Sequence, residues 1–244
     1  MGRKPEGQCM NARATPLRRP YSGIYSVPDA ALYLRATTPP PEMVLRLWEK
    51  KRRVFIGPNS RHLYAWIRRG VEDYSGRDIV LTFEELVRMR MIVILRSRGL
   101  SLPAILSSES YIRSLTGSPQ PFVTESLWSS SSDIFLEFMG LLAVTKQGQL
   151  AMEFLKEYLL PVHHGLEFDA AGISAIWRPM PGVLIDPDIQ FGAPCIEGTR
   201  VETEAIWSFH QTGETIDRLA SWYAVDRQQI EAAIEWEATL ARAA

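Results

Sequence analysis

In the first half of the chain, apolar residues recur at the three- and four-residue spacing that one face of a helix requires. This spacing predicts helices at residues 26–34, 42–52, 60–69 and 83–98, and another from residue 101. Ser26 and Thr82 are each followed three positions later by an acidic residue, a capping-box pattern that marks a helix start. Residues 71–81 lack the helical spacing and favour a small loop-and-strand wing.

The 60–69 helix has the most clearly divided faces. Leu63, Trp66 and Ile67 fall on one side, and Gly70 lies just past the end. The other positions carry basic and hydrogen-bonding side chains, namely Arg61, His62, Tyr64, Arg68 and Arg69. A short capped helix, an arginine-bearing helix, a wing and a longer helix follow the order of a winged helix-turn-helix.

Strand patterns dominate the centre of the chain. Glycine, serine and proline are dense at residues 116–121 and indicate a boundary. Beyond it the pattern predicts strands at 122–128 and 134–139, a helix at 149–160, and a hairpin whose strands, 166–168 and 173–177, flank a turn at 169–172. Residues 179–182 are interpreted as a second linker.

The last sixty residues have the clearest helical pattern. A strand at 183–185 and a glycine-containing loop at 192–200 precede three helices, which we predict at about 202–211, 215–223 and 226–241. Asp226 and Gln229 mark the start of the last helix. Helices this short need one another for stability, so they are expected to form one trihelical, helix-turn-helix-like unit.

These patterns predict an α+β protein that is mainly helical. Its parts are a flexible basic arm at 1–20, a winged helix-turn-helix domain at 21–115, a middle region with hairpins at 119–180, and an acidic trihelical domain at 183–244.

Composition narrows the class of protein. Of 244 residues, 46% are hydrophobic and 23% are charged, which is ordinary for a folded protein. No apolar run reaches eighteen residues and no apolar signal core is seen at the N-terminus, so a membrane span and secretion are not expected. Cys9 and Cys195 are too few for a disulfide framework or a zinc site. A cytoplasmic location is expected.

Charge divides the chain into two unlike halves. Residues 1–113 carry 20 Lys and Arg against 10 Asp and Glu, a net charge of +10. Residues 114–244 carry 7 against 18, a net charge of −11. This asymmetry predicts a basic module for a polyanion and an acidic module for another partner.

Patterns of catalytic chemistry are weak. The sequence has no GxSxG, P-loop, HExxH or GxGxxG pattern. The adjacent His163 and His164 do not face a common point. Asp186 and Asp188 are typical of a turn, and Cys195 has no histidine nearby in sequence. We therefore expect no enzymatic activity, no cofactor and no metal.

The segments YSVPDAALYL, LYAWIRRG and LTFEELVRMRMIVILRSRGLS, within residues 21–106, resemble the DNA-binding domain of MerR-type proteins. The resemblance implies binding to double-stranded operator DNA. An insertion of about twenty residues, 37–57, separates the two core helices. The recognition helix is therefore either 60–69, which we favour, or 42–52, which ends in Lys50, Lys51, Arg52 and Arg53.

The segment VLIDPDIQFGAPCIEGTRVETEAIWSFHQTGETIDRLASWYAVDRQQIEAAIEWE resembles the domain-of-unknown-function family 433. Its IDP strand, GxPxIxGTR loop and GETIDRLA-like helix carry the resemblance. Proteins that join a MerR-like N-terminus to this domain resemble VapB-type antitoxins, which implies a PIN-type ribonuclease toxin as partner. Candidate interface residues are the aromatics and the loop residues Trp207, Phe209, Trp222, Tyr223, Trp236, Gly198, Thr199 and Arg200.

The leading hypothesis is a homodimeric antitoxin that binds its operator through the basic half and a toxin through the acidic half. The acidic helices suit covering of the toxin's basic RNA path, whereas insertion of a cation into its carboxylate cluster has the candidates Arg178, Arg200, Arg218 and Arg227. Two alternatives are a transcription regulator whose residues 119–178 sense a ligand, with no toxin, and an interaction protein whose basic half binds RNA.

Overall fold

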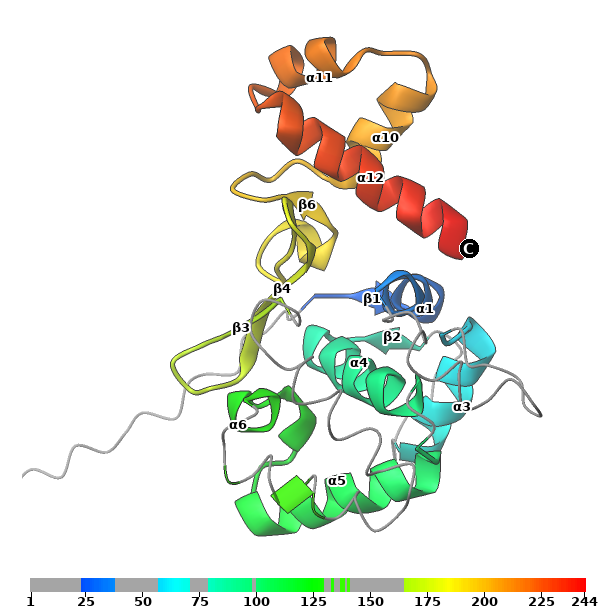
Figure 1. The fold of residues 1–244 in the computed structure, drawn as a ribbon, viewed down its shortest axis with the longest axis vertical. Coiled ribbons are helices and arrows are strands. Elements are labelled where there is room, and N and C mark those ends of the chain that lie inside the picture. The colour runs from blue at the N-terminus through cyan, green and yellow to red at the C-terminus, as the bar shows by residue number, and fades with distance from the viewer. Residues whose placement is uncertain are drawn as a thin grey trace, which may run out of the picture.

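The computed structural model describes residues 23–37, 57–70, 79–97, 100–129 and 165–244, with the single positions 133, 137, 138 and 140 between them. This part of the chain is mainly helical α+β, with eight α-helices, a two-stranded ribbon and a four-stranded antiparallel sheet. Figure 1 shows three tiers, in which the sheet lies between N-terminal helices below and C-terminal helices above.

The lower tier is built around one central helix, α4. Almost every described side chain of α4 is buried, including Arg88 and Arg90, because helices and a ribbon surround it. The elements of this tier are β1 (Tyr25–Ser26), α1 (Val27–Ala36), α3 (Ser60–Gly70), β2 (Val80–Leu81), α4 (Phe83–Ser97), α5 (Leu102–Thr116), η1 (Pro121–Val123) and α6 (Glu125–Trp128). The strands β1 and β2 are antiparallel neighbours.

Helix starts in this tier lie where the capping patterns predict them. The Asp29 amide donates to Ser26 Oγ at 3.2 Å at the start of α1. At α4 the box is complete, because the Thr82 amide donates to Glu85 Oε2 at 2.8 Å and the Glu85 amide donates to Thr82 Oγ1 at 3.2 Å. These bonds satisfy amides that a helix end leaves without an internal partner.

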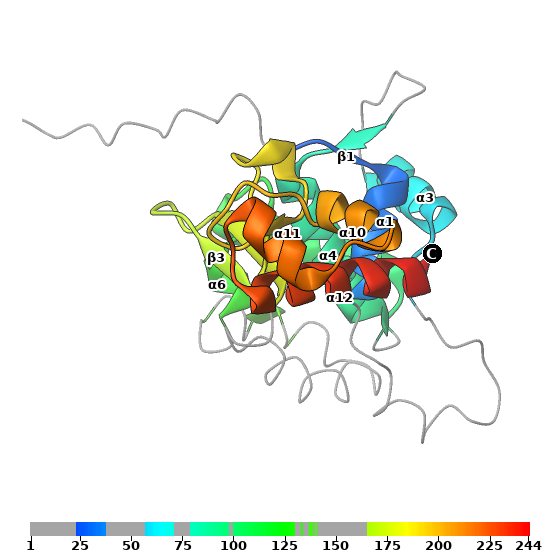
Figure 2. The same ribbon diagram turned by 90° about the horizontal axis from the view of Figure 1, so that it is seen from above.

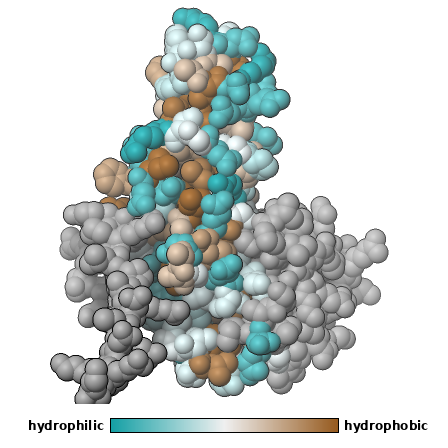
Figure 3. All heavy atoms as spheres, turned by 90° about the vertical axis from the view of Figure 1, so that its left-hand side faces the viewer, coloured by the Kyte–Doolittle hydropathy of each residue, from teal (hydrophilic) through white to brown (hydrophobic). Residues whose placement is uncertain are grey.

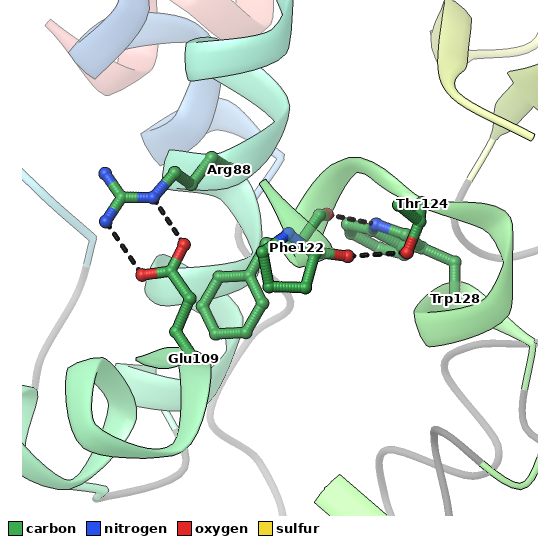
Figure 4. A network of polar contacts seen from close by, with 6 residues as sticks. Arg88, Glu109, Phe122, Thr124 and Trp128 are labelled. Atoms are coloured by element: carbon green, nitrogen blue, oxygen red, sulfur yellow. Dashed lines mark hydrogen bonds and ion pairs between the residues drawn. The ribbon is translucent and has the colours of Figure 1, made fainter. Parts of the chain in front are cut away.

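The strand predicted at residues 122–128 is wrong. This segment forms the 3-10 turn η1 and the short helix α6, and the Trp128 indole donates to the Phe122 carbonyl at 2.7 Å (Figure 4). Apolar residues at 122, 123, 127 and 128 are buried together, which a turn of helix permits and a strand with alternating faces does not.

The strand predicted at 134–139 is also not found in its described part. Positions 133, 137, 138 and 140 are helical. Phe138 lies edge-on to Phe122 of η1, with 5.6 Å between ring centroids. The helix predicted at 149–160 lies outside the described residues.

The four-stranded sheet has the order β3-β4-β5-β6, with all neighbours antiparallel. Its strands are β3 (Leu166–Phe168), β4 (Ser174–Met180), β5 (Val183–Ile185) and β6 (Cys195–Ile196). The predicted hairpin is confirmed, and Asp169 Oδ1 closes its turn by accepting from the amides of Ala171 and Ile173. Residues 179–182 are not a linker, because 179 and 180 end β4 and 181 and 182 form the tight turn to β5, so the sheet continues across them.

Three helices complete the chain within two residues of their predicted bounds. They are α10 (Thr203–Gln211), α11 (Ile216–Tyr223) and α12 (Arg227–Ala243), and the Asp226–Gln229 capping box begins α12. Their own small core contains Ile206, Leu219 and Ile230. Seen from above, these helices lie over α1 and α4, and the end of α12 packs on α1 (Figure 2). None of the described helices is long and apolar enough to cross a membrane.

Candidate nucleic-acid and protein interfaces

Helix α3 turns one apolar face inward and one basic face outward. Leu63, Trp66 and Ile67 are buried, as their spacing predicts, and α3 packs against α1. Asn59 precedes the helix, and its Oδ1 accepts from the His62 amide at 3.0 Å. The exposed side chains include Arg61, His62, Arg68 and Arg69, which we call the α3 basic face, while Tyr64 is half-buried at its edge.

The α3 basic face is not neutralised by its own helix. No acidic residue occurs between Ser60 and Gly70. Within the described part of the chain, Arg61, Arg68 and Arg69 make no ion pair, so their guanidinium groups face solvent. The rival candidates Lys50, Lys51, Arg52 and Arg53 lie outside the described residues, as does the basic arm at 1–20.

Two arginines of the basic half belong to the core. Arg88 of α4 donates to both carboxylate oxygens of Glu109 of α5, at 2.6 and 2.7 Å, and both side chains are buried (Figure 4). Such a two-bond pair satisfies a guanidinium that has left water. The number of basic residues in the N-terminal half therefore overstates how many of them a nucleic acid can reach.

Arg90, also on α4, joins the lower tier to the sheet. It is 4% exposed, and its guanidinium lies 5.5 Å from the ring centroid of Trp128 and 4.7 Å from that of Trp177 on β4. A cation over an aromatic face is attracted by the ring quadrupole. Sequence spacing gave no sign of this role, since the three residues come from α4, α6 and β4.

The predicted interface aromatics divide into three groups by burial. Trp236 is 1% exposed and packs against Tyr33 of α1, with 6.0 Å between ring centroids, so it joins two parts of the same chain. Trp207 and Tyr223 are half-buried. Phe209 and Trp222 are 43% and 51% exposed and meet edge to face with 6.0 Å between centroids.

The predicted interface loop is held by its threonine. Thr199 Oγ1 donates to the Ile196 carbonyl at 2.8 Å and accepts from the Val201 amide at 3.0 Å. Gly198 has a φ of +78°, which favours glycine, and open space where a Cβ would stand. Arg200 is exposed, and its carbonyl accepts from the Gln190 side chain at 3.0 Å.

Most arginines in the acidic half are already paired. Arg178 pairs with Glu167 and Glu197, and Arg218 Nη1 lies 3.0 Å from Glu214 Oε2. Arg227 pairs with Asp217 at 2.5 Å and with Glu231 at 2.9 Å. Of the four arginines considered for insertion into a toxin, Arg200 alone makes no ion pair within the described residues.

Cys195 and Asp186, two of the residues considered for catalysis or metal binding, have structural roles: Cys195 is buried and Asp186 forms a turn. Cys195 is buried, and burial raises the pKa of its thiol to about 11, so the thiol stays protonated at neutral pH. Asp186 Oδ1 accepts from the Asp188 amide at 2.8 Å, which is a local turn. Among the described residues, no three His, Cys, Asp or Glu side chains lie close enough to hold a metal ion. His163 and His164 lie outside the described residues.

The most exposed aromatic side chain among the described residues, that of Phe191, was not predicted as an interface residue. Phe191 is 71% exposed, and its backbone lies in the left-handed region with a φ of 53°. Its carbonyl accepts from the Ile24 amide at 3.0 Å. In the sequence, the position of Phe191 directly before Gly192 in a polar turn could have indicated an exposed aromatic side chain.

Comparison with known proteins finds a family match in the C-terminal part of the chain. Residues 183–236 match the family described as "Protein of unknown function (DUF433)", which confirms the resemblance of this segment. No curated protein matches the chain. The structure is similar to the X-ray crystal structure of Rv2018 from Mycobacterium tuberculosis, with a TM-score of 0.62 and 16% identity, over 86% of this chain and 96% of that chain. At this identity the likeness shows a common fold.

Proposed function

We propose that this protein is a cytoplasmic, non-enzymatic antitoxin of a type II toxin–antitoxin pair. A homodimer binds operator DNA through the lower tier, and the acidic upper tier holds a PIN-type ribonuclease inactive. The observation that carries the DNA part is the α3 basic face, which presents three guanidinium groups from a helix without a carboxylate.

The shape and chemistry of α3 support contact with duplex DNA. Its eleven residues span about 16 Å, and a helix fits the major groove, which is roughly 12 Å wide. Guanidinium groups release counterions when they meet phosphates and form paired hydrogen bonds with guanine. Helix α3 packs on α1, and both strands of the β1–β2 ribbon also contact α1. This arrangement supports the winged helix-turn-helix assignment.

The upper tier is a poorer candidate for DNA. From residue 204 to residue 235 it carries six carboxylates and two guanidinium groups. Both guanidinium groups, on Arg218 and Arg227, are paired with carboxylates of the same chain. This surface would repel phosphates, so the charge supports a protein partner.

The ion pairs also bear on how a nuclease would be silenced. Insertion of a cation into the carboxylate cluster of the nuclease needs an arginine that is not held in an ion pair of its own chain. Arg178, Arg218 and Arg227 are each held by carboxylates of this chain. We therefore favour covering of a basic RNA path by the acidic helices, with Arg200 as the remaining candidate for insertion.

The DNA part is tested by replacing Arg61, Arg68 and Arg69 with alanine together. Binding of the full chain to the DNA upstream of its own gene is measured by fluorescence anisotropy from low to high salt. Loss of three phosphate contacts should weaken binding about 100-fold and reduce the salt slope by about three. Arg113→Ala, at an exposed arginine of α5, is the matched control.

Unchanged affinity and slope in the triple variant, with an unchanged circular dichroism spectrum, would move the DNA site to residues 42–52. The toxin part is tested most cheaply by the neighbouring reading frame. A PIN-type nuclease encoded there should be inhibited by the purified chain, and the absence of inhibition would favour a regulator that has no toxin.

A further inference from the structure

The top of the molecule carries two exposed aromatic side chains that are not part of its core. Phe209 lies near the end of α10 and Trp222 near the end of α11, and their rings meet edge to face. The small core of these helices is complete without them, because Ile206, Leu219 and Ile230 fill it. In Figure 3, which shows one side of this tier, apolar residues stand exposed among hydrophilic ones.

The ion pair of Arg218 and Glu214 lies beside the exposed Trp222. The Arg218 guanidinium lies 5.0 Å from the Trp222 ring centroid, and Arg218 also pairs with Glu214. The guanidinium is thus held in place before any partner arrives. We call the four residues Phe209, Glu214, Arg218 and Trp222 the α10–α11 surface. Trp, Arg and other aromatic residues in fixed positions are the residues that dominate binding at protein interfaces.

The charge around this surface selects the partner. The same helices carry the exposed carboxylates of Asp217, Asp226 and Glu231, of which Asp217 and Glu231 pair with Arg227. From residue 204 to residue 235 six carboxylates still outnumber two guanidinium groups, and this excess disfavours a nucleic acid. The same face of a second copy would bring acidic helices against acidic helices. A basic protein meets both conditions, because cations pair with the rim and an apolar side chain contacts the rings.

We infer that the α10–α11 surface docks a basic protein, with an apolar side chain of that partner against the rings of Phe209 and Trp222. This inference rests on the proposed function, since the partner of this chemistry would be the PIN-type nuclease. It names the place of contact and leaves Trp236, Tyr223 and the 198–200 loop outside it.

The molecule offers a matched control at Phe191. This side chain is more exposed than either aromatic of the surface and lies in the same acidic half, but on the turn before β6. If the partner bound nonspecifically to exposed aromatic side chains, Phe191→Ala would therefore weaken binding as much as Trp222→Ala.

The experiment measures binding of the full chain to the purified PIN-type nuclease from the neighbouring gene, by biolayer interferometry at several salt concentrations. Trp222→Ala and Phe209→Ala should each weaken binding at least about 30-fold, and Phe191→Ala less than about threefold. The association rate of the wild type should fall as salt rises. Operator binding and the melting temperature should be unchanged in all three variants, because none of these side chains is buried.

The outcomes separate the two proposals. A wild-type chain that does not bind the nuclease overturns the toxin part of the proposed function, and this inference with it. Wild-type inhibition that both surface variants retain in full overturns the inference alone. Equal losses for Phe191→Ala and Trp222→Ala also overturn it. A fall in the mass of the chain itself on Trp222→Ala, measured by sedimentation equilibrium, would assign the surface to contact between copies instead.

Discussion

Arginine behaves differently in the two ends of this molecule. On α3 three arginines face solvent from a helix that has no carboxylate. On α11 and α12, Arg218 and Arg227 are also exposed, but each is paired with acidic neighbours. The positive charge available to a partner therefore depends on which arginines lie next to carboxylates in the folded chain. The number of basic residues in a segment does not give this charge.

The lower tier itself makes the same point. Arg88 and Arg90 contribute to its basic composition, yet both are buried and hold helices and sheet together. Three predictions test how buried and exposed side chains differ between the tiers.

The largest effect is expected where the tiers join. Trp236→Ala removes the ring that packs on Tyr33, and should lower the free energy of unfolding by about 4 kcal/mol, as for other buried aromatics. Urea unfolding followed by circular dichroism measures it. Trp222→Ala, at the exposed tryptophan of the same tier, should cost less than about 1 kcal/mol. Equal losses would mean that α12 does not rest on α1.

The next effect concerns the buried charges of the lower tier. Glu109→Ala leaves the Arg88 guanidinium buried without its carboxylate, and should destabilise the protein by about 3 kcal/mol. Replacing both residues, as in the pair Arg88→Met and Glu109→Leu, should recover most of that loss. A single variant as stable as the wild type would show that Arg88 can reach water, and would return its charge to the surface available to DNA.

The smallest effect is a pH dependence within the upper tier, where α12 meets α10. Burial raises the pKa of Glu237, whose carboxylate accepts from Thr203. The folded protein therefore binds this proton more tightly than the unfolded chain does, and this contribution to stability, present at low pH, is lost as pH rises through the folded pKa.

Glu237→Gln should accordingly be more stable than the wild type at neutral pH, and the difference should shrink below the ordinary glutamate pKa of 4.5. Thermal melts from pH 4 to pH 8 measure it. Glu235→Gln, at an exposed position of the same helix, is the control. A stability difference that does not change with pH would show that Glu237 is solvated.

Sequence patterns succeeded where local interactions decide the structure. The apolar face of α3, the capping boxes of α4 and α12, and the three C-terminal helices depend on residues within four positions of one another. The strand predicted at 122–128 was wrong because the helical turns of this segment are fixed by contacts with α4, α5 and Phe138. The two candidate recognition helices stay a choice, since one of them lies outside the described residues.

Sequence patterns alone located the starts of the longer helices and the apolar face of α3, and showed that basic and acidic residues separate along the chain. These properties arise from neighbouring residues, whose spacing the backbone fixes. Only the tertiary structure decided that Trp236 is internal while Trp222 is exposed, and that Arg88 and Arg90 are unavailable to a ligand. Burial and ion pairing depend on residues that are distant in sequence, such as Arg88 and Glu109, and a residue's type and spacing do not specify them.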